Sequence, residues 1–250
     1  MSETFLKRGP HARLEAAGLR WLAQAGGVAV CPVLRADDEG LLLPRIERTA
    51  PTAAAAEAFG RDLARTHAAG ADRFGAPPPG VDGPGRIGAL ELPSATSPQP
   101  WGVFYAELRV RPYVRAARDA GTLSAADVAL FDAVCDRLAA GEVPGAVTAP
   151  ARLHGDLWSG NVLWSPRGVV LIDPAAHGGH PETDLAMLAL FGLPHLDRVL
   201  DARAEAGPLP PGWRRRVPLH QLHPLLVHTV LFGGGYAGQA VRAARDTLAL

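Results

Sequence analysis

Apolar residues recur every three or four positions over most of the chain, a spacing typical of helices that bury one face. We predict helices over these ranges: 13–24, 52–69, 101–120 and 124–140, with four more from residue 181 to the C-terminus. Ser124 suits the N-cap of the fourth helix, and Pro181 suits the first turn of the fifth. The chain is therefore expected to be mainly helical.

Short apolar runs predict a small amount of sheet near the N-terminus. Residues 4–7, 28–34 and 41–46 are expected to be strands, with Asp37 to Gly40 as the hairpin turn between the last two. Residues 70–100 are rich in Pro and Gly and are expected to be a loop.

A second hairpin is predicted around residues 165–168, which read Ser-Pro-Arg-Gly between two apolar runs. Proline second and glycine fourth is the pattern of a type I turn. If Trp164 pairs with Val169 across this turn, Asn161 and Asp173 fall at the same end of the hairpin.

Asp156 lies on the loop that enters this hairpin, within the sequence LHGDLWSGNVLW. Two carboxylates and an amide oxygen, from Asp156, Asp173 and Asn161, are thus expected to converge. Oxygen ligands of this kind suit Mg²⁺, which binds one or two carboxylates together with substrate phosphates. A carboxylate that does not bind the metal can accept the proton of a hydroxyl group, so the pattern favours phosphoryl transfer.

Composition narrows the possible partners. The 250 residues carry 25 basic and 25 acidic side chains, which argues against a nucleic-acid or anionic-membrane partner. Cys31 and Cys135 lack the spacing of a zinc site or a disulfide framework, and we find no apolar segment that could serve as a signal or a membrane span. A cytoplasmic protein is expected.

Lys7 is the only lysine among the 25 basic residues. A chain that otherwise uses arginine suggests that this position needs a compact ammonium group, although an incidental surface lysine is the alternative. Three other features favour structural roles. His177 and His180 are expected to be loop residues, His228 to be a core histidine, and Gly233 to Gly235 to be a helix break.

The motifs HGDLWSGN, LIDPAAHGGHPETDLAM and FGGGYAGQ together resemble the fructosamine kinase (ketosamine 3-kinase) family. This family belongs to the aminoglycoside-phosphotransferase-like kinases, and the resemblance runs from about Phe5 to the C-terminus. It implies a two-lobed, protein-kinase-like α+β fold. Residues 1–50 would form a truncated N-terminal lobe, and residues 51–250 would form a mainly helical C-terminal lobe.

The resemblance also implies roles for individual residues. Asp156 would be the catalytic aspartate that deprotonates the attacking hydroxyl, and Asn161 and Asp173 would hold Mg²⁺ on the phosphates of ATP. His154 would brace the catalytic loop, and Asp184 would tie that loop to the following helix.

The N-terminal segment would bind the nucleotide. The sequence FLKR matches the family's strand whose lysine contacts the phosphates, so Lys7 would pair with Glu15 of the next helix. Pro44 and Ile46 would lie at the hinge beside adenine, where Pro44 cannot donate a backbone hydrogen bond.

Four further residues are expected near the sugar substrate on the same resemblance. The segment WGVFYAELRVRP, which contains Trp101 and Arg109, resembles the helix beside the acceptor site. Trp158 and Tyr236 would supply aromatic walls. The implied reaction is ATP-dependent phosphorylation of a sugar hydroxyl on a ketosamine, which would begin deglycation, by a protein expected to be a monomer.

Two other functions stay open. One is phosphorylation of an aminoglycoside or an amino-alcohol, against which the DLWSGN and FGGGY motifs argue. The other is a binding role without catalysis. Only six residues precede Lys7, whereas the family has two strands and a phosphate-covering loop there, so we expect a late start site, an open nucleotide site or lost turnover.

Overall fold

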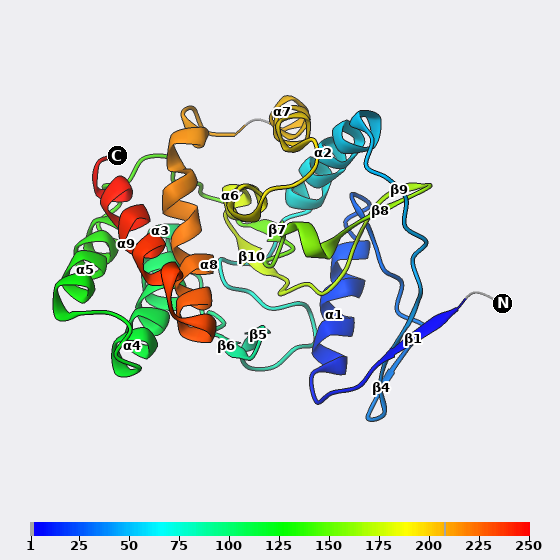
Figure 1. The fold of residues 1–250 in the computed structure, drawn as a ribbon, viewed down its shortest axis with the longest axis horizontal. Coiled ribbons are helices and arrows are strands. Elements are labelled where there is room, and N and C mark those ends of the chain that lie inside the picture. The colour runs from blue at the N-terminus through cyan, green and yellow to red at the C-terminus, as the bar shows by residue number, and fades with distance from the viewer. Residues whose placement is uncertain (1–2, 208) are drawn as a thin grey trace.

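Strands β1 (Thr4–Lys7) and β4 (Gly40–Pro44) lie with helix α1 (Ala12–Ala23) on one side of the molecule, and helices α5 (Ala125–Ala139) and α9 (Gly235–Leu248) lie on the other (Figure 1). The computed structural model describes residues 3–207 and 209–250. In the N-terminal part the elements are β1 (Thr4–Lys7), α1 (Ala12–Ala23), β2 (Ala29–Val30), β3 (Arg35–Asp37), β4 (Gly40–Pro44) and α2 (Ala53–Ala68). Strands β1, β4 and β3 form an antiparallel sheet in that order, and α1 packs on it through a small apolar core.

The strand predicted over residues 28–34 is confirmed only in part, and its predicted hairpin pairing with residues 41–46 was wrong. Only Ala29–Val30 form a strand, and β2 pairs in parallel with β9 (Gly168–Leu171), far along the chain. The backbone N–H of Cys31 also donates to Leu171, and Pro32 has no N–H to continue a ladder. The hairpin partner of β4 is instead β3, across the predicted turn.

The loop predicted over residues 70–100 contains a short hairpin that we did not expect. Strands β5 (Gly85–Ile87) and β6 (Leu90–Leu92) pair across it. Ile87 and Leu92 are both buried, and the hydroxyl of Tyr113 donates to the carbonyl of Glu91 at 2.8 Å. Buried apolar anchors therefore hold this Pro- and Gly-rich segment against the helices.

The helix predicted over residues 101–120 is interrupted by a π-helical turn. Its parts are α3 (Trp101–Tyr105), the π segment η1 (Ala106–Val110) and α4 (Arg111–Asp119). Pro112 lies in the first turn of α4 and cannot donate the hydrogen bond that would continue a regular helix. The next helix, α5 (Ala125–Ala139), begins with Ser124 as its N-cap, as predicted.

The second predicted hairpin is confirmed in its register. Trp164 pairs with Val169, and the N–H of Ile172 donates to the carbonyl of Asn161 at 3.2 Å. Around it lie β7 (Ala151–Leu153), the 3₁₀ turn η2 (Ser159–Asn161), β8 (Val162–Ser165), β9 and β10 (His177–Gly179). Strand β10 pairs with β7, so the segments before and after the hairpin are joined as well.

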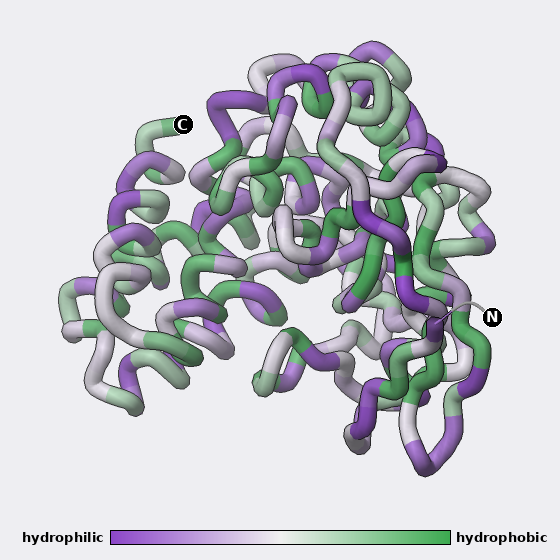
Figure 2. The backbone as a smooth tube through the Cα atoms, turned by 45° about the vertical axis from the view of Figure 1, so that its right-hand side comes forward, coloured by the Kyte–Doolittle hydropathy of each residue, from purple (hydrophilic) through white to green (hydrophobic). Residues whose placement is uncertain are grey.

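From residue 181 onward, the described part of the chain contains four α-helices, as the apolar pattern predicted. They are α6 (Pro181–Phe191), α7 (Leu196–Ala206), α8 (Val217–Phe232) and α9 (Gly235–Leu248), with a 3₁₀ turn η3 (Trp213–Arg216) before α8. Hydrophilic and hydrophobic stretches alternate along the tube near the C-terminus (Figure 2). No helix in the described part of the chain is both long enough and apolar enough to cross a membrane.

Candidate active site

The segment between β7 and β8 is held by Asp184, which lies one turn into α6. The carboxylate accepts the backbone N–H of His154 at 2.9 Å and that of Gly155 at 3.0 Å. It also lies 3.1 Å from Nε2 of His67, whose other ring nitrogen accepts from Nε of Arg203. His67 therefore donates to Asp184.

Asp184 is kept ionised by this arrangement. Burial would raise the pKa of its carboxyl, but the hydrogen bond from His67 and those from the backbone hold the pKa below its ordinary value. Burial lowers the pKa of His67, so its ring stays neutral. Sequence reasoning expected a bracing role for Asp184 but did not find His67 or Arg203, which come from α2 and α7.

Gly155 allows the loop to approach the segment after β9 closely. Its φ is +82°, and a Cβ atom there would lie 2.1 Å from the carbonyl oxygen of Ala175. Only glycine avoids that contact and tolerates that backbone conformation. The glycine in HGD thus brings Asp156 toward Asp173.

The predicted convergence of Asp156, Asn161 and Asp173 is present. The amide nitrogen of Asn161 donates to the backbone carbonyl of Asp156 at 2.8 Å and to its carboxylate at 3.2 Å, and lies 3.4 Å from the carbonyl of Asp173. This fixes the amide so that its Oδ1 accepts no hydrogen bond from the described residues. Asp173 has a φ of +52°, which is uncommon for aspartate and typical of functional sites.

The ring of His154 supports the loop that carries Asp156. Its Nε2 donates to the carbonyl of Ile172 at 2.9 Å, and its Nδ1 accepts the N–H of Asp156. Burial raises the pKa of Asp156, while the charge of His154 and the hydrogen bond from Asn161 partly oppose that shift. Asp156 is therefore a carboxylate with increased basicity.

Lys7 lies between two acids. Its Nζ is 2.7 Å from Glu15 of α1 and 2.9 Å from Asp173. Burial lowers the pKa of Lys7, but the hydrogen bonds to Glu15 and Asp173 raise it above its ordinary value overall. The ion pair between Lys7 and Glu15 that the resemblance implied is present in the structure.

One cavity of about 290 Å³ connects these groups. Lys7, Glu15, Asp156 and Asp173 all line it, together with Arg109 from η1 and residues of the β5–β6 hairpin. A lysine and several carboxylates on one cavity are side chains of the kind that phosphoryl transfer from a nucleotide uses.

Comparison with known proteins identifies the family. Residues 9–249 match the fructosamine kinase family. The chain belongs to the fructosamine kinase family. Among curated relatives, a probable ketoamine kinase of Thermus thermophilus is 34% identical over 233 residues, which cover 92% of this chain and 80% of that protein. A probable ketoamine kinase of Klebsiella aerogenes is 35% identical over 161 residues, and these span 62% of this chain and 54% of the relative.

Solved structures agree with this assignment. A Thermobifida fusca protein provisionally named fructosamine-3-kinase has a TM-score of 0.91 and 47% identity, over all of this chain and 86% of that one. A macrolide 2′-phosphotransferase of Brachybacterium faecium has a TM-score of 0.58 at 17% identity, over 96% of this chain and 83% of that one. The latter shows a shared fold, so the predicted kinase-like α+β fold class is confirmed.

Pro44 and Ile46, the two residues expected at the hinge beside adenine, lie at the end of β4 and just after it. Pro44 ends β4, and its carbonyl lies 3.7 Å from the thiol of Cys31. Ile46 follows β4, and among the described residues its backbone N–H has no hydrogen-bond partner. Neither residue lines the cavity of Asp156, so a hinge role for them stays a prediction.

Trp158 and Tyr236 belong to one aromatic cluster. Trp158 lies edge-on to Phe191 at 6.0 Å between ring centroids, and Phe191 and Tyr236 each contact His228, at 5.0 and 5.1 Å. Phe232 extends the cluster and is 67% exposed. His228 is partly buried, and its Nδ1 donates to the carbonyl of Pro224 at 2.7 Å, so its interpretation as a core histidine stays a prediction. Its charge slightly opposes the rise that burial causes in the pKa of Asp156.

Trp101 does not reach this cluster. It is 3% exposed and packs against Tyr105, His180 and His220 in the core of the helical part. It does not line the cavity of Asp156 either. A substrate contact by Trp101 therefore does not fit its position, because α3 turns its indole ring toward α6 and α8.

The expectation of a loop position was wrong for His177, whereas His180 lies between β10 and α6, outside any helix or strand, as expected. His177 begins β10 and is buried, and His180 is the buried N-cap of α6. Burial lowers the pKa of both rings to about 3, so both are neutral. Pairing of β10 with β7 brings this segment inside the molecule.

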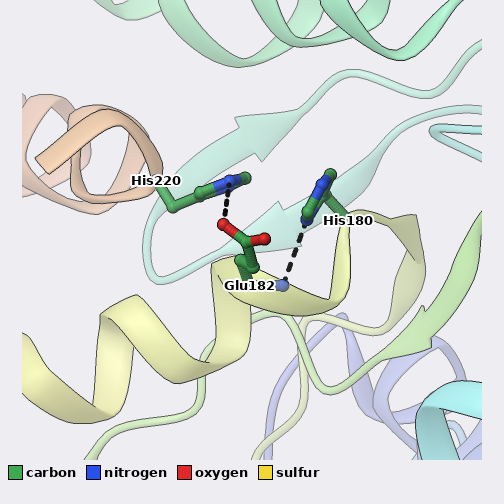
Figure 3. A group of neighbouring side chains, drawn as sticks. All are labelled: His180, Glu182 and His220. Atoms are coloured by element: carbon green, nitrogen blue, oxygen red, sulfur yellow. Dashed lines mark hydrogen bonds and ion pairs between the residues drawn. The ribbon is translucent and has the colours of Figure 1, made fainter. Parts of the chain in front are cut away.

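His180, Glu182 and His220 place possible metal ligands within 4.8 Å of one another (Figure 3). Both carboxylate oxygens of Glu182 are, however, occupied by Arg216, at 2.5 and 3.0 Å. A cation would have to displace the buried guanidinium of Arg216 or share the oxygens of Glu182 with it. This guanidinium already balances the charge of the carboxylate. We interpret the group as a structural network that joins α6 to α8.

Proposed function

We propose that this protein transfers the γ-phosphoryl group of ATP to a sugar hydroxyl of a ketosamine. The observation that supports this is the arrangement of Asp156 and Asp173 on the same cavity as the Lys7–Glu15 ion pair. Family membership supports a ketosamine as the acceptor, as do the names of the Thermus and Thermobifida relatives.

In this proposal Asp156 accepts the proton of the attacking hydroxyl. Burial raises the pKa of its carboxyl, and a carboxylate with a raised pKa is the stronger base. The backbone bonds from the catalytic loop to Asp184 and the amide of Asn161 hold that carboxylate in place. Positioning of this kind supplies much of the rate in phosphoryl transfer.

Asn161 and Asp173 would hold Mg²⁺. Oδ1 of Asn161 accepts no bond within the described residues, and Asp173 presents a carboxylate that is 45% exposed, so both offer the oxygen ligands that the ion prefers. Bound there, Mg²⁺ would neutralise charge on the phosphates of ATP. Lys7, which now contacts Asp173, would pair with those phosphates while Glu15 keeps its ammonium in position.

Phosphorus NMR of the protein with MgATP and fructosyl-lysine tests the proposal. We expect a new phosphomonoester signal, and the Asp156→Asn variant should form it about 10² to 10⁴ times more slowly. Asp82→Asn, an exposed aspartate outside the cavity, is the matched control and should react at the normal rate. If the folded protein binds ATP but forms no phosphomonoester, the proposed transfer is wrong and a binding role takes its place.

A further inference from the structure

Arg109 is a buried cation on the cavity of Asp156 for which the described residues provide no acidic partner. Its side chain is 1% exposed, and no carboxylate lies within ion-pair distance of it in residues 3–207 and 209–250. Nε and Nη2 of its guanidinium are both buried without a hydrogen-bond partner. Burial lowers the pKa of Arg109 to about 10, a value at which it still carries its charge at neutral pH.

The π-helical turn explains how this guanidinium is held. Pro112 cannot donate to the carbonyl of Leu108, and Nη1 of Arg109 donates to that carbonyl at 2.9 Å instead. Nη1 also donates to the carbonyl of Pro93 at 2.7 Å. The guanidinium also lies over the ring of Phe104, 4.7 Å from its centroid. The two hydrogen bonds of Nη1 and this contact with the ring therefore hold the guanidinium in place.

The unpaired atoms form one edge of the guanidinium. Nε and Nη2 present two parallel N–H groups, the geometry that binds both oxygens of a carboxylate. An unpaired buried charge is costly, and π-helical turns occur frequently at functional sites. The free edge therefore points to a ligand group rather than to a structural role.

The neighbours of Arg109 favour an anion as that group. Arg86 of β5 lines the same cavity and also has an unpaired Nε. Burial and the charge of Arg109 keep His177 neutral, with a pKa of about 3. The acids on the cavity wall are Glu15, Asp156 and Asp173, which come from α1 and the catalytic loops, and Glu15 and Asp173 already pair with Lys7.

We propose that Arg109 binds the carboxylate of an amino-acid ketosamine whose sugar hydroxyl faces Asp156. This inference rests on the proposed function, since it specifies the acceptor class for the same site. It predicts a preference for ketosamines derived from free amino acids over those derived from neutral amines. A phosphate on the reaction product could use the same edge, so binding is best measured without nucleotide.

The test is calorimetric binding of fructosyl-glycine and of its neutral amide, fructosyl-glycinamide, in the absence of ATP. Charged bidentate hydrogen bonds predict a dissociation constant about tenfold or more lower for the acid. Acids with longer spacers, made from β-alanine and γ-aminobutyrate, then show which distance from the sugar suits the site. Equal affinity for acid and amide at every spacer length, or no binding of any probe, would overturn the inference.

Arg109→Gln should remove the preference for the acid while leaving affinity for the amide within about twofold. Arg115→Gln, an exposed arginine on α4, is the matched control and should keep the preference. If Arg109→Gln fails to fold, equal affinity of the unaltered protein for acid and amide would still overturn the inference, and Arg109→Lys, which keeps the charge without the two parallel N–H groups, should reduce the preference for the acid. Phosphorylation of the neutral amide reports separately on the proposed function, because that reaction needs Asp156 but does not need a carboxylate on the substrate.

Discussion

Two groups of ionisable residues flank the loop that carries Asp156, and they differ in how far their hydrogen bonds are satisfied by the protein. Asp184 accepts from His154, Gly155 and His67, and it is fully buried. On the cavity side, Oε1 of Glu15 and the free edge of Arg109 have no partner within the described residues. The completed group fixes the backbone, and the incomplete one leaves polar atoms for ligands.

This difference in hydrogen bonding predicts which substitutions should lower stability and which should lower activity. Groups whose bonds are complete in the folded protein contribute to its stability, because their removal leaves buried partners unpaired. Groups that keep unpaired atoms reduce stability, and such costs are common where ligands bind. Substitutions on the two sides of the loop should therefore have opposite effects.

The largest effect is expected for Asp184→Asn. Both oxygens accept backbone N–H groups, so either orientation of the new amide turns its NH₂ toward a donor. Loss of this buried carboxylate should lower the free energy of unfolding by about 3–5 kcal/mol, as measured by urea denaturation.

Asp156→Asn is the comparison variant for that experiment. Because burial raises the pKa of Asp156, its ionised form is disfavoured in the folded state, and a neutral amide should leave stability unchanged or increase it. Equal destabilisation by the two substitutions would contradict the division between the two sides.

A smaller effect is expected for Gly155→Ala. The new methyl group would meet the carbonyl of Ala175 at 2.1 Å in addition to the cost of a positive φ. We expect a loss of about 2 kcal/mol or more, together with reduced phosphorylation, since the loop carrying Asp156 must shift.

Gly168→Ala separates these two costs. Gly168 also has a positive φ, +109°, but a Cβ atom added there would meet nothing within 4 Å. Only the conformational cost of about 1–2 kcal/mol should remain, with phosphorylation unaffected. A loss of activity in Gly168→Ala equal to that in Gly155→Ala would show that close approach to Ala175 is unimportant.

The part of the site that is local in sequence could be predicted. Asn161 and Asp173 come together because one hairpin with a recognisable turn determines their register. The solitary Lys7 and the family motifs indicated the ion pair with Glu15. Patterns of residue type and spacing carry this information directly.

The parts that depend on distant segments could not be predicted. His67 reaches Asp184 from a helix 117 residues away in sequence, and Arg203 reaches His67 across 136 residues. The sequence around both residues resembles that of an ordinary amphipathic helix. Likewise, β2 pairs with β9 rather than with its neighbour β4, so tertiary pairing overrides the local apolar run. The free edge of Arg109 depends on Pro112 and on the β5–β6 hairpin together.

The last prediction concerns the pH dependence of stability and the carboxyl group of Glu15. Burial raises the pKa of Glu15 to about 7, although the hydrogen bond from Lys7 opposes the shift. Between about pH 4.5 and 7 the folded carboxyl keeps a proton that the unfolded chain releases. The stabilisation from this group is therefore complete below pH 4.5 and is lost as pH rises to 7.

Glu15→Gln should remove this dependence. The unfolding free energy of the unaltered protein, minus that of the variant, should fall between pH 5 and 7 by no more than about 1.4 kcal/mol per pH unit. Glu57→Gln changes an exposed partner of Arg198 and should give a flat difference curve. A flat curve for Glu15→Gln would mean that Lys7 fully compensates the burial of Glu15, so that this acid belongs with Asp184 among the completed groups. A falling curve would mean that Glu15 belongs with Arg109 among the groups on the cavity side of the loop. There the ammonium group of Lys7, which contacts both Glu15 and Asp173, is the group that we expect to bind phosphate.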